Sequence, residues 1–385
     1  MADQTPDRPP ERYHAFDALR GAMMLLVVVF HALLPYMVTR GPFAFKDPDR
    51  NAFFDLAALF MHSWRVPAFF VVAGFFAALL YHRRGRVKAR NNRLLRIGLP
   101  LAAGWIVLAP LSLAALQFAR AAADAGNVAA GMTAVGEMRW LEWDNPYHLW
   151  FLIALLLLYL YARLLQIVLG RLRVAERPWF DRLLRWFLAN PWRPLLLAIL
   201  LAPGYVRSEF LPAYRGNAGL VWAFMIYFSA GLALYRHRDL VPDLARGAWA
   251  CLLSGLAMLP LAAWSREASA IAPAHSEAGL TVLAGTSFAV MGSLLVFAAI
   301  GLFVRYFAHP SPAMRWLGDA SYWIYLAHFP LVVAIGGVMA TTGLPLAVKF
   351  VVTVVATVVL LLVVYRYGIR YTAIGRVLNG PRTRP

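Results

Sequence analysis

Apolar stretches of about 20 residues recur along almost the whole chain, and they constrain its fold more than any other feature. A helix of about 20 residues is long enough to cross the roughly 30 Å hydrocarbon core of a bilayer. In lipid the backbone must satisfy its own hydrogen bonds, and a helix does so within one segment. The sequence therefore predicts an all-α, polytopic bundle of transmembrane helices.

The composition agrees with a membrane protein. Of the 385 residues, 61% are hydrophobic and 15% are charged, whereas soluble domains contain about 45–50% apolar residues. Ten spans are expected, at residues 17–37, 56–82, 94–118, 147–169, 193–206, 217–235, 249–265, 279–307, 321–340 and 346–366. The fifth is short and flanked by prolines, so a nine-span alternative remains, with the two termini on opposite sides of the membrane.

Lysine and arginine are distributed unevenly between the two sets of connecting segments. Cytoplasmic loops retain these residues, and placing both termini in the cytoplasm puts most of the 37 on that side. The net charge of +18 is therefore interpreted first as a topology signal and as attraction to the lipid bilayer. No nucleic-acid recognition module is visible. A basic face also suits a polyanionic ligand, because guanidinium groups pair with phosphates in a bidentate fork.

One transmembrane domain, residues 13–370, accounts for nearly the whole chain. Residues 1–12, rich in proline and charge, are expected to form a disordered cytoplasmic tail, and residues 371–385 a second cytoplasmic tail. The single cysteine, Cys251, argues against a disulfide framework and a thiolate metal site. No metal, nucleotide or hydrolase motif is present in the sequence, so no metal is expected.

The first span contains ionisable residues, which are costly in lipid and usually face the interior of a bundle. At about 100° per residue, Asp17, Arg20 and His31 fall on one helical face, and Asp17 and Arg20 can pair. His31 lies roughly 21 Å beyond Asp17, past the middle of the membrane. A neutral imidazole at that depth is a candidate general base. The alternative is a buried histidine hydrogen-bonded to a neighbouring helix.

Four further candidates are expected near the outer side. His62 and Arg65 lie one turn apart in the second span. Arg65 either extends to the outer headgroups or lines a pocket for an anionic ligand. His148 and Trp150 begin the fourth span, and they belong either to an aromatic belt at the membrane interface or to a sugar-binding rim.

Two further motifs lie in the third and ninth spans. In RLLRIGLP, Arg93 and Arg96 share a face where the helix enters the membrane. Topology alone explains them, or they bind phosphates at the mouth of an inner cavity. In SYWIYLAHFP, Tyr325 and His328 share a face at i, i+3 spacing. These two either form hydrogen bonds within the bundle or line a channel for an acyl group.

In order along the chain, these motifs resemble the integral-membrane acyltransferase 3 family. The resemblance rests on Arg12 followed by FDALRG and His31, on RLLRIGLP, and on SYWIYLAH, and it covers nearly the whole chain. The stretches HSWRVPAFFVVAGFF and YHLWFLIALL are most similar to the branch that succinylates osmoregulated periplasmic glucans.

The resemblance implies a multi-pass O-acyltransferase of the bacterial inner membrane that moves an acyl group from cytosolic acyl-CoA to hydroxyls of a periplasmic glucan. Succinyl-CoA or acetyl-CoA is then the donor substrate, and no tightly bound cofactor is implied. His31 matches the essential histidine of the family. Arg93 and Arg96, with Arg90 upstream, match the acyl-CoA side.

The remaining candidates take roles that follow from this reaction. Asp17 and Arg20 are expected to support the base, and Arg65 to pair with the free carboxylate of a succinyl group. The acyl carboxylate or the acceptor is expected to be bound by His62, His148 and Trp150.

Other functions remain open at this stage. One is an O-acetyltransferase of another cell-envelope polysaccharide. Another is a transporter or flippase of an anionic lipid or glycan, because intramembrane charges also mark such pathways. A third is a sensor or assembly subunit whose buried polar residues only pack helices. The oligomeric state is not predicted.

Overall fold

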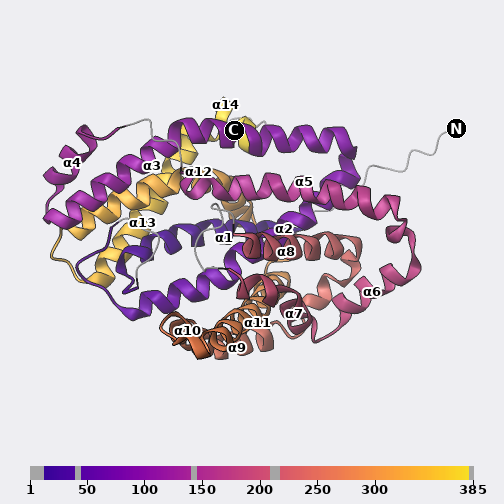
Figure 1. The fold of residues 1–385 in the computed structure, drawn as a ribbon. Helices are drawn as coiled ribbons and strands as arrows, with labels where there is room; N and C mark the ends of the chain where they lie inside the picture. The colour runs from indigo at the N-terminus through magenta and orange to yellow at the C-terminus, as the bar shows by residue number, and fades with distance from the viewer. Residues whose placement is uncertain (1–12, 40–44, 140–144, 209–216, 381–385) are drawn as a thin grey trace.

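The computed structural model describes residues 13–39, 45–139, 145–208 and 217–380, and this part of the chain is helical, without a β-strand (Figure 1). The main helices are α1 (His14–Leu33), α2 (Ala52–Arg93), α3 (Leu99–Ala125), α4 (Val128–Gly136), α5 (Trp150–Arg171), α6 (Pro178–Ala189), α7 (Arg193–Val206), α8 (Ala218–Arg236), α9 (Ala248–Ala257), α10 (Leu259–Ala270), α11 (Ala274–Tyr306), α12 (Pro312–Ala340), α13 (Leu346–Val364) and α14 (Ala373–Asn379). Short turns η1 (Leu34–Tyr36), η2 (Leu94–Gly98) and η3 (Tyr147–Leu149) join some of them. The all-helical prediction is confirmed.

Eight helical stretches in the described ranges are long and apolar enough to cross a membrane, and α7 is a shorter apolar helix. One of the eight, Ala52–Ala125, has 74 residues. Within it, Arg93 Nη2 donates to the Phe76 carbonyl at 3.4 Å across 17 sequence positions, although 17 positions of straight helix span about 25 Å. The chain therefore turns back between them. It does so at Gly85, whose φ of 70° lies in the left-handed region that glycine adopts readily.

This reversal separates the second expected span from the third. Helix length and composition define a multi-pass membrane protein, while ten crossings and two cytoplasmic termini remain predictions. Residues 1–12 lie outside the described residues. In the C-terminal segment, α14 packs against α12, and Asn379 Nδ2 donates to the Asp319 carbonyl at 2.7 Å.

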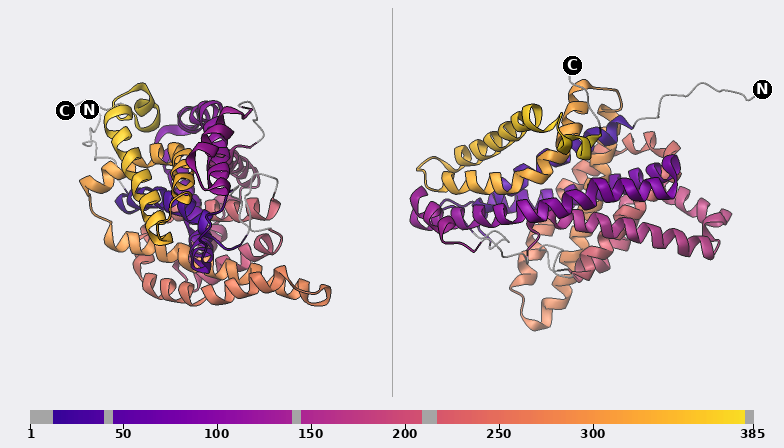
Figure 2. Two further views of the ribbon diagram at one scale, coloured as in Figure 1. Left: turned by 90° about the vertical axis from the view of Figure 1, so that its left-hand side faces the viewer. Right: turned by 90° about the horizontal axis from the view of Figure 1, so that it is seen from above.

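Helix α1 runs through the middle of the bundle (Figures 1 and 2), and α11 packs against α7, α9 and α10 as well as against α1 and α2. In their most apolar windows 61% and 67% of residues are buried, against 22% for the windows in α5 and α13. Helix α1 packs against α2, α11, α12 and α13. The peripheral helices expose leucine and valine side chains, as lipid contact requires. Asp17, Arg20 and His31 are each partly buried in this packing.

Two glycines bring α2 and α8 into close contact. A Cβ atom on Gly74 would collide with the Phe228 carbonyl, and one on Gly231 would collide with the Val71 carbonyl. Small residues at helix crossings give transmembrane helices their packing contacts where lipid supplies no hydrophobic driving force. This crossing fixes the position of α2, which carries Arg65.

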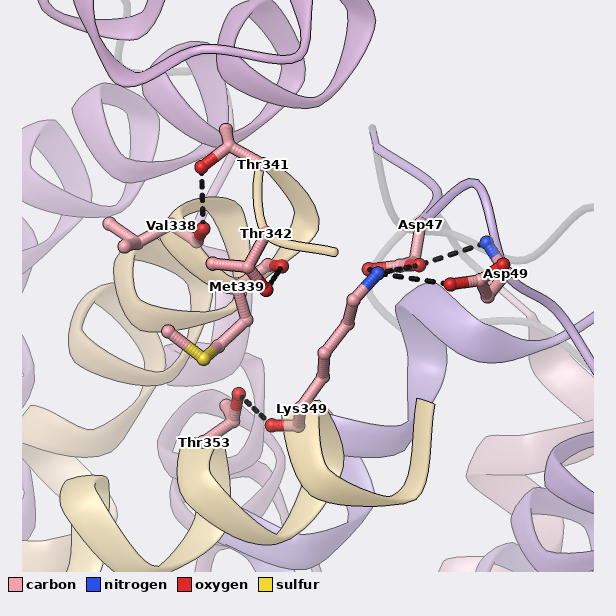
Figure 3. A network of polar contacts seen from close by, with 8 residues as sticks. All are labelled: Asp47, Asp49, Val338, Met339, Thr341, Thr342, Lys349 and Thr353. Carbon is pink, nitrogen blue, oxygen red and sulfur yellow. Dashed lines mark hydrogen bonds and ion pairs between the residues drawn. The ribbon is translucent and has the colours of Figure 1, made fainter. Parts of the chain in front are cut away.

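A buried ion pair ties the start of α13 to the segment that leads into α2 (Figure 3). Lys349 Nζ lies 3.0 Å from Asp47 Oδ1 and 3.1 Å from Asp49 Oδ2. Lys349 and Asp47 are each only 1% exposed, so each charge needs the other inside the protein. Because the Asp47 amide also donates to the Pro35 carbonyl at 3.1 Å, this Lys349 bridge secures the end of α1 as well.

Candidate active site

Three histidines from distant parts of the chain meet in the bundle. His31 comes from α1, His328 from α12 and His148 from η3. His31 Nδ1 lies 3.0 Å from His328 Nε2, and the His148 and His328 ring centroids are 5.2 Å apart. The sequence allowed His31 to be simply a buried histidine that is hydrogen-bonded to a neighbouring helix, and its contact with His328 of α12 agrees with that interpretation. It is equally compatible with a base, because a general base needs an oriented imidazole.

A proline explains the position of His148. Pro330 lacks an N–H group, so it leaves the Leu326 carbonyl, four residues earlier in α12, without its helical donor. His148 Nε2 lies 2.9 Å from that oxygen and donates to it. In return, the Tyr325 hydroxyl donates to the His148 carbonyl at 2.7 Å. Two hydrogen bonds therefore lock η3 onto α12.

With Nε2 as the donor, neutral His148 presents Nδ1 as an acceptor. That atom is buried and has no hydrogen-bond partner in the described part of the chain. Phe329 covers the His148 ring at 5.2 Å between centroids, in a stacked geometry, and also contacts His31 edge-on at 5.2 Å. Buried polar atoms are rarely left unsatisfied, so Nδ1 of His148 is a candidate to receive a donor from a ligand.

Arg65 of α2 contacts Phe30, the residue of α1 next to His31. Its guanidinium carbon is 4.6 Å from the centroid of the Phe30 ring, and His62 stacks on the same ring at 5.9 Å. Arg65 is 6% exposed, and its Nε has no hydrogen-bond partner in the described residues. Phe30 in turn contacts the His31 ring at 5.4 Å. The structure thus brings Arg65 and His62 close to His31, whereas Trp150 stacks on Phe224 of α8 at 6.1 Å.

Three further arginines, Arg20, Arg93 and Arg96, lie near one another at one end of the bundle, which we name the arginine end. Arg20 pairs with Asp17 at 3.4 Å, as their spacing predicts. Its guanidinium lies 5.9 Å from the ring centroid of Phe76, whose carbonyl accepts from Arg93.

The predicted donor-binding arginines differ in their surroundings. The Arg93 guanidinium is 4.5 Å from the Tyr159 ring centroid, and its Nε is buried without a partner in the described chain. The Arg96 carbonyl accepts from the Tyr322 hydroxyl at 2.5 Å. The Arg90 side chain is exposed and lies 3.4 Å from Asn91. Of the three side chains, that of Arg93 therefore contacts the bundle interior, whereas Arg96 contacts α12 through its backbone carbonyl.

A row of aromatic rings on α12 connects the arginine end to the histidines. Tyr322 and Tyr325 stack at 6.4 Å between centroids, and Tyr325 and His328 are 6.1 Å apart. The predicted sharing of one face by Tyr325 and His328 is confirmed. Sequence reasoning did not include Tyr159 or Phe329. Tyr159 has no local motif, whereas Phe329 could have been found, because it lies inside SYWIYLAHFP.

A small, open recess of about 30 Å³ lies beside Arg20, at the arginine end. Side chains of both signs line it, among them His14, Asp17, His309, Arg315 and Asp319. It lies well away from the cluster of His31, His148 and His328, because Arg20 and His31 are roughly 16 Å apart along α1.

The structure thus defines a multi-pass membrane protein with a histidine cluster between arginines. Comparison with protein families identifies the class: the model of the acyltransferase domain matches residues 13–366, and the chain belongs to this acyltransferase 3 family. It is therefore a membrane acyltransferase.

Curated relatives include glucans biosynthesis protein C of Escherichia coli (strain K12) and of Escherichia coli (strain SMS-3-5 / SECEC). Each is 27% identical over 150 residues, which is 39% of this chain and 38% of the relative. The chain thus aligns with less than half of the length of these relatives. No solved structure matches the chain.

Proposed function

We propose that this protein moves an acyl group, succinyl in preference to acetyl, from cytosolic acyl-CoA to hydroxyls of a periplasmic glucan across the bacterial inner membrane. One observation carries the proposal: His31, hydrogen-bonded to His328, lies between the arginine end and Arg65. A donor from one side and an acceptor from the other meet at its imidazole.

The arginine end binds the donor and faces the cytoplasm. Coenzyme A carries several phosphate charges, which guanidinium groups bind in bidentate fashion. Arg20 and Arg315 line the recess, and Arg93 donates to the carbonyl of Phe76, whose ring lies 5.9 Å from the Arg20 guanidinium. The buried and unpartnered Nε of Arg93 is one donor that such an anion would satisfy.

The thioester reaches His31 along the aromatic row. From Arg20 to His31 the distance along α1 is roughly 16 Å, so the acyl group has to be carried into the bundle on an extended arm. Tyr322 and Tyr325 lie along this path. Their rings provide an apolar wall, and their hydroxyls are already satisfied by backbone carbonyls.

His31 acts as the general base in a direct transfer. The sugar hydroxyl oxygen attacks the thioester carbonyl while His31 removes the hydroxyl proton. The carbon–sulfur bond then breaks, the ester is formed, and the coenzyme A thiolate recovers the proton from the imidazolium. A positioned base of this kind contributes about 10²–10⁴ in rate.

Arg65 favours a succinyl over an acetyl group. The succinyl group ends in a free carboxylate, and burying a carboxylate without a partner is costly. Arg65 is a buried cation close to the ring that flanks His31. An O-acetyltransferase acting on another envelope polysaccharide would not need this cation, because an acetyl group has no free carboxylate.

The name of the relatives supports a glucan as the acceptor, with His62 and His148 as candidate contacts to its hydroxyls. The test is to incubate the purified protein in detergent with radiolabelled succinyl-CoA and a β-glucan. We expect label in the glucan as an alkali-labile ester, with one free thiol released per ester. Thiol release that does not depend on glucan, or glucan binding without thioester cleavage as in a transporter, would contradict the proposal.

A further inference from the structure

The two ring nitrogens of His328 have different partners. Nδ1 lies 2.7 Å from the Tyr325 carbonyl, and Nε2 lies 3.0 Å from His31 Nδ1. A carbonyl oxygen only accepts hydrogen bonds, so the proton of the neutral ring must be on Nδ1. His328 therefore offers Nε2 to His31 as an acceptor.

The same accounting fixes the tautomer of His31. Its Nδ1 lies 3.0 Å from the Val27 carbonyl and 3.0 Å from His328 Nε2, and both of these are acceptors. The proton of neutral His31 is therefore on Nδ1, and the lone pair is on Nε2. If His328 carried its proton on Nε2 and donated to His31 instead, the Nδ1 lone pairs of His31 and His328 would face the carbonyl oxygens of Val27 and Tyr325.

Exposure separates the roles of the two rings. His328 is 0% exposed, whereas His31 is only partly buried. A substrate can therefore contact His31, and His328 acts through it. The surroundings are cationic on one side, because Arg65 lies against Phe30 next to His31. An imidazolium formed on His31 needs a compensating acceptor, and His328 Nε2 supplies one at 3.0 Å.

We propose that His328 is a positioning residue that holds His31 in the Nδ1-protonated tautomer and stabilises the imidazolium formed during transfer. This proposal rests on the proposed role of His31 as the base. A residue that only lined a channel for the acyl group would not need this hydrogen bond to His31. A hydrogen-bond partner at one ring nitrogen is how proteins generally set the tautomer and orientation of a reactive imidazole.

The test exploits the two amide side chains. His328→Gln places an amide oxygen near the position of Nε2 and keeps the acceptor for His31. His328→Asn places its amide near Nδ1 and loses that acceptor while keeping the contact to Tyr325. We expect the kcat of His328→Asn to fall about 100-fold, with the KM for succinyl-CoA unchanged. We expect His328→Gln to retain at least about ten times the kcat of His328→Asn.

Each outcome bears on a different claim. Equal loss of kcat in the two amide variants, or a change in KM alone, would overturn the positioning role. The comparison is valid only for variants that elute as monodisperse protein and bind coenzyme A with the wild-type Kd, and His328→Leu serves as a second variant without an acceptor. His31→Ala is measured in parallel: if it stays active, the proposed base is wrong, and if it is inactive while His328→Asn is active, only the positioning role fails.

Discussion

The imidazole of His148 replaces the helical donor that Pro330 cannot give: its Nε2 lies 2.9 Å from the Leu326 carbonyl. Pro330→Ala would return an N–H group to that carbonyl and compete with His148. We expect kcat/KM for the glucan to fall about tenfold while thermal stability is kept or increased, because alanine is the better helix former. Pro110→Ala in α3 is the matched control, since it also lies inside a helix. Equal activity in both variants would contradict this role of Pro330.

Arg65 is predicted to select the acyl group. Arg65→Gln removes the cation and keeps hydrogen-bonding capacity, so succinyl transfer should fall at least about tenfold more than acetyl transfer. Arg65→Lys should recover part of the difference, because it restores charge without the planar fork. The measurement is kcat/KM for the two donors. Arg246→Gln, at a highly exposed side chain, is the control. Equal losses for succinyl and acetyl would refute the carboxylate role.

Arg93 is predicted to bind the donor. Losing hydrogen bonds between a charged side chain and a phosphate costs about 1.5–3 kcal/mol, so Arg93→Ala should weaken coenzyme A binding by about 10–150-fold. Because the loss lies in ground-state binding, KM for acyl-CoA should rise more than kcat falls. Arg90→Ala should have a smaller effect, since that side chain is exposed. A Kd for coenzyme A unchanged by Arg93→Ala would contradict the assignment.

The Lys349 bridge is predicted to stabilise the fold. Lys349→Met leaves the Asp47 carboxylate buried without its cation, and breaking a buried pair costs about 3–5 kcal/mol. The midpoint of thermal unfolding in detergent should fall clearly. The double variant Asp47→Asn/Lys349→Met should regain part of the loss, because the uncompensated charge is gone. Lys88→Met, at an exposed position of α2, is the control. A double variant less stable than Lys349→Met would contradict the explanation.

Much of the fold could be predicted from local sequence, because span length and hydropathy are properties of contiguous residues. The pairing of Asp17 with Arg20 follows from helical spacing in the same way. What could not be predicted is which helices touch. His31 and His328 are 297 positions apart, and His148 and Leu326 are 178 apart. Such contacts depend on how the helices pack against one another. The hydrophobic periodicity of one helix does not show which other helix it contacts.

The Lys349 bridge illustrates the same limit. Lys349 lies near the start of an apolar span, where a lysine is expected to extend toward the headgroups. Instead it is buried against Asp47, 302 positions away. The role of Pro330 could be predicted from the sequence only in part. Its sequence position predicts an unpaired carbonyl at Leu326, and only the structure identifies His148 as the donor that satisfies it.

The central claim is that His31 is the base for acyl transfer, and the most direct measurement is glucan ester formation by His31→Ala in detergent. We expect a loss of at least about 100-fold in kcat, with coenzyme A binding unchanged. We expect His275→Ala, at an exposed position of α11, to be as active as wild type. Ester formation at the wild-type rate by His31→Ala would contradict the central claim.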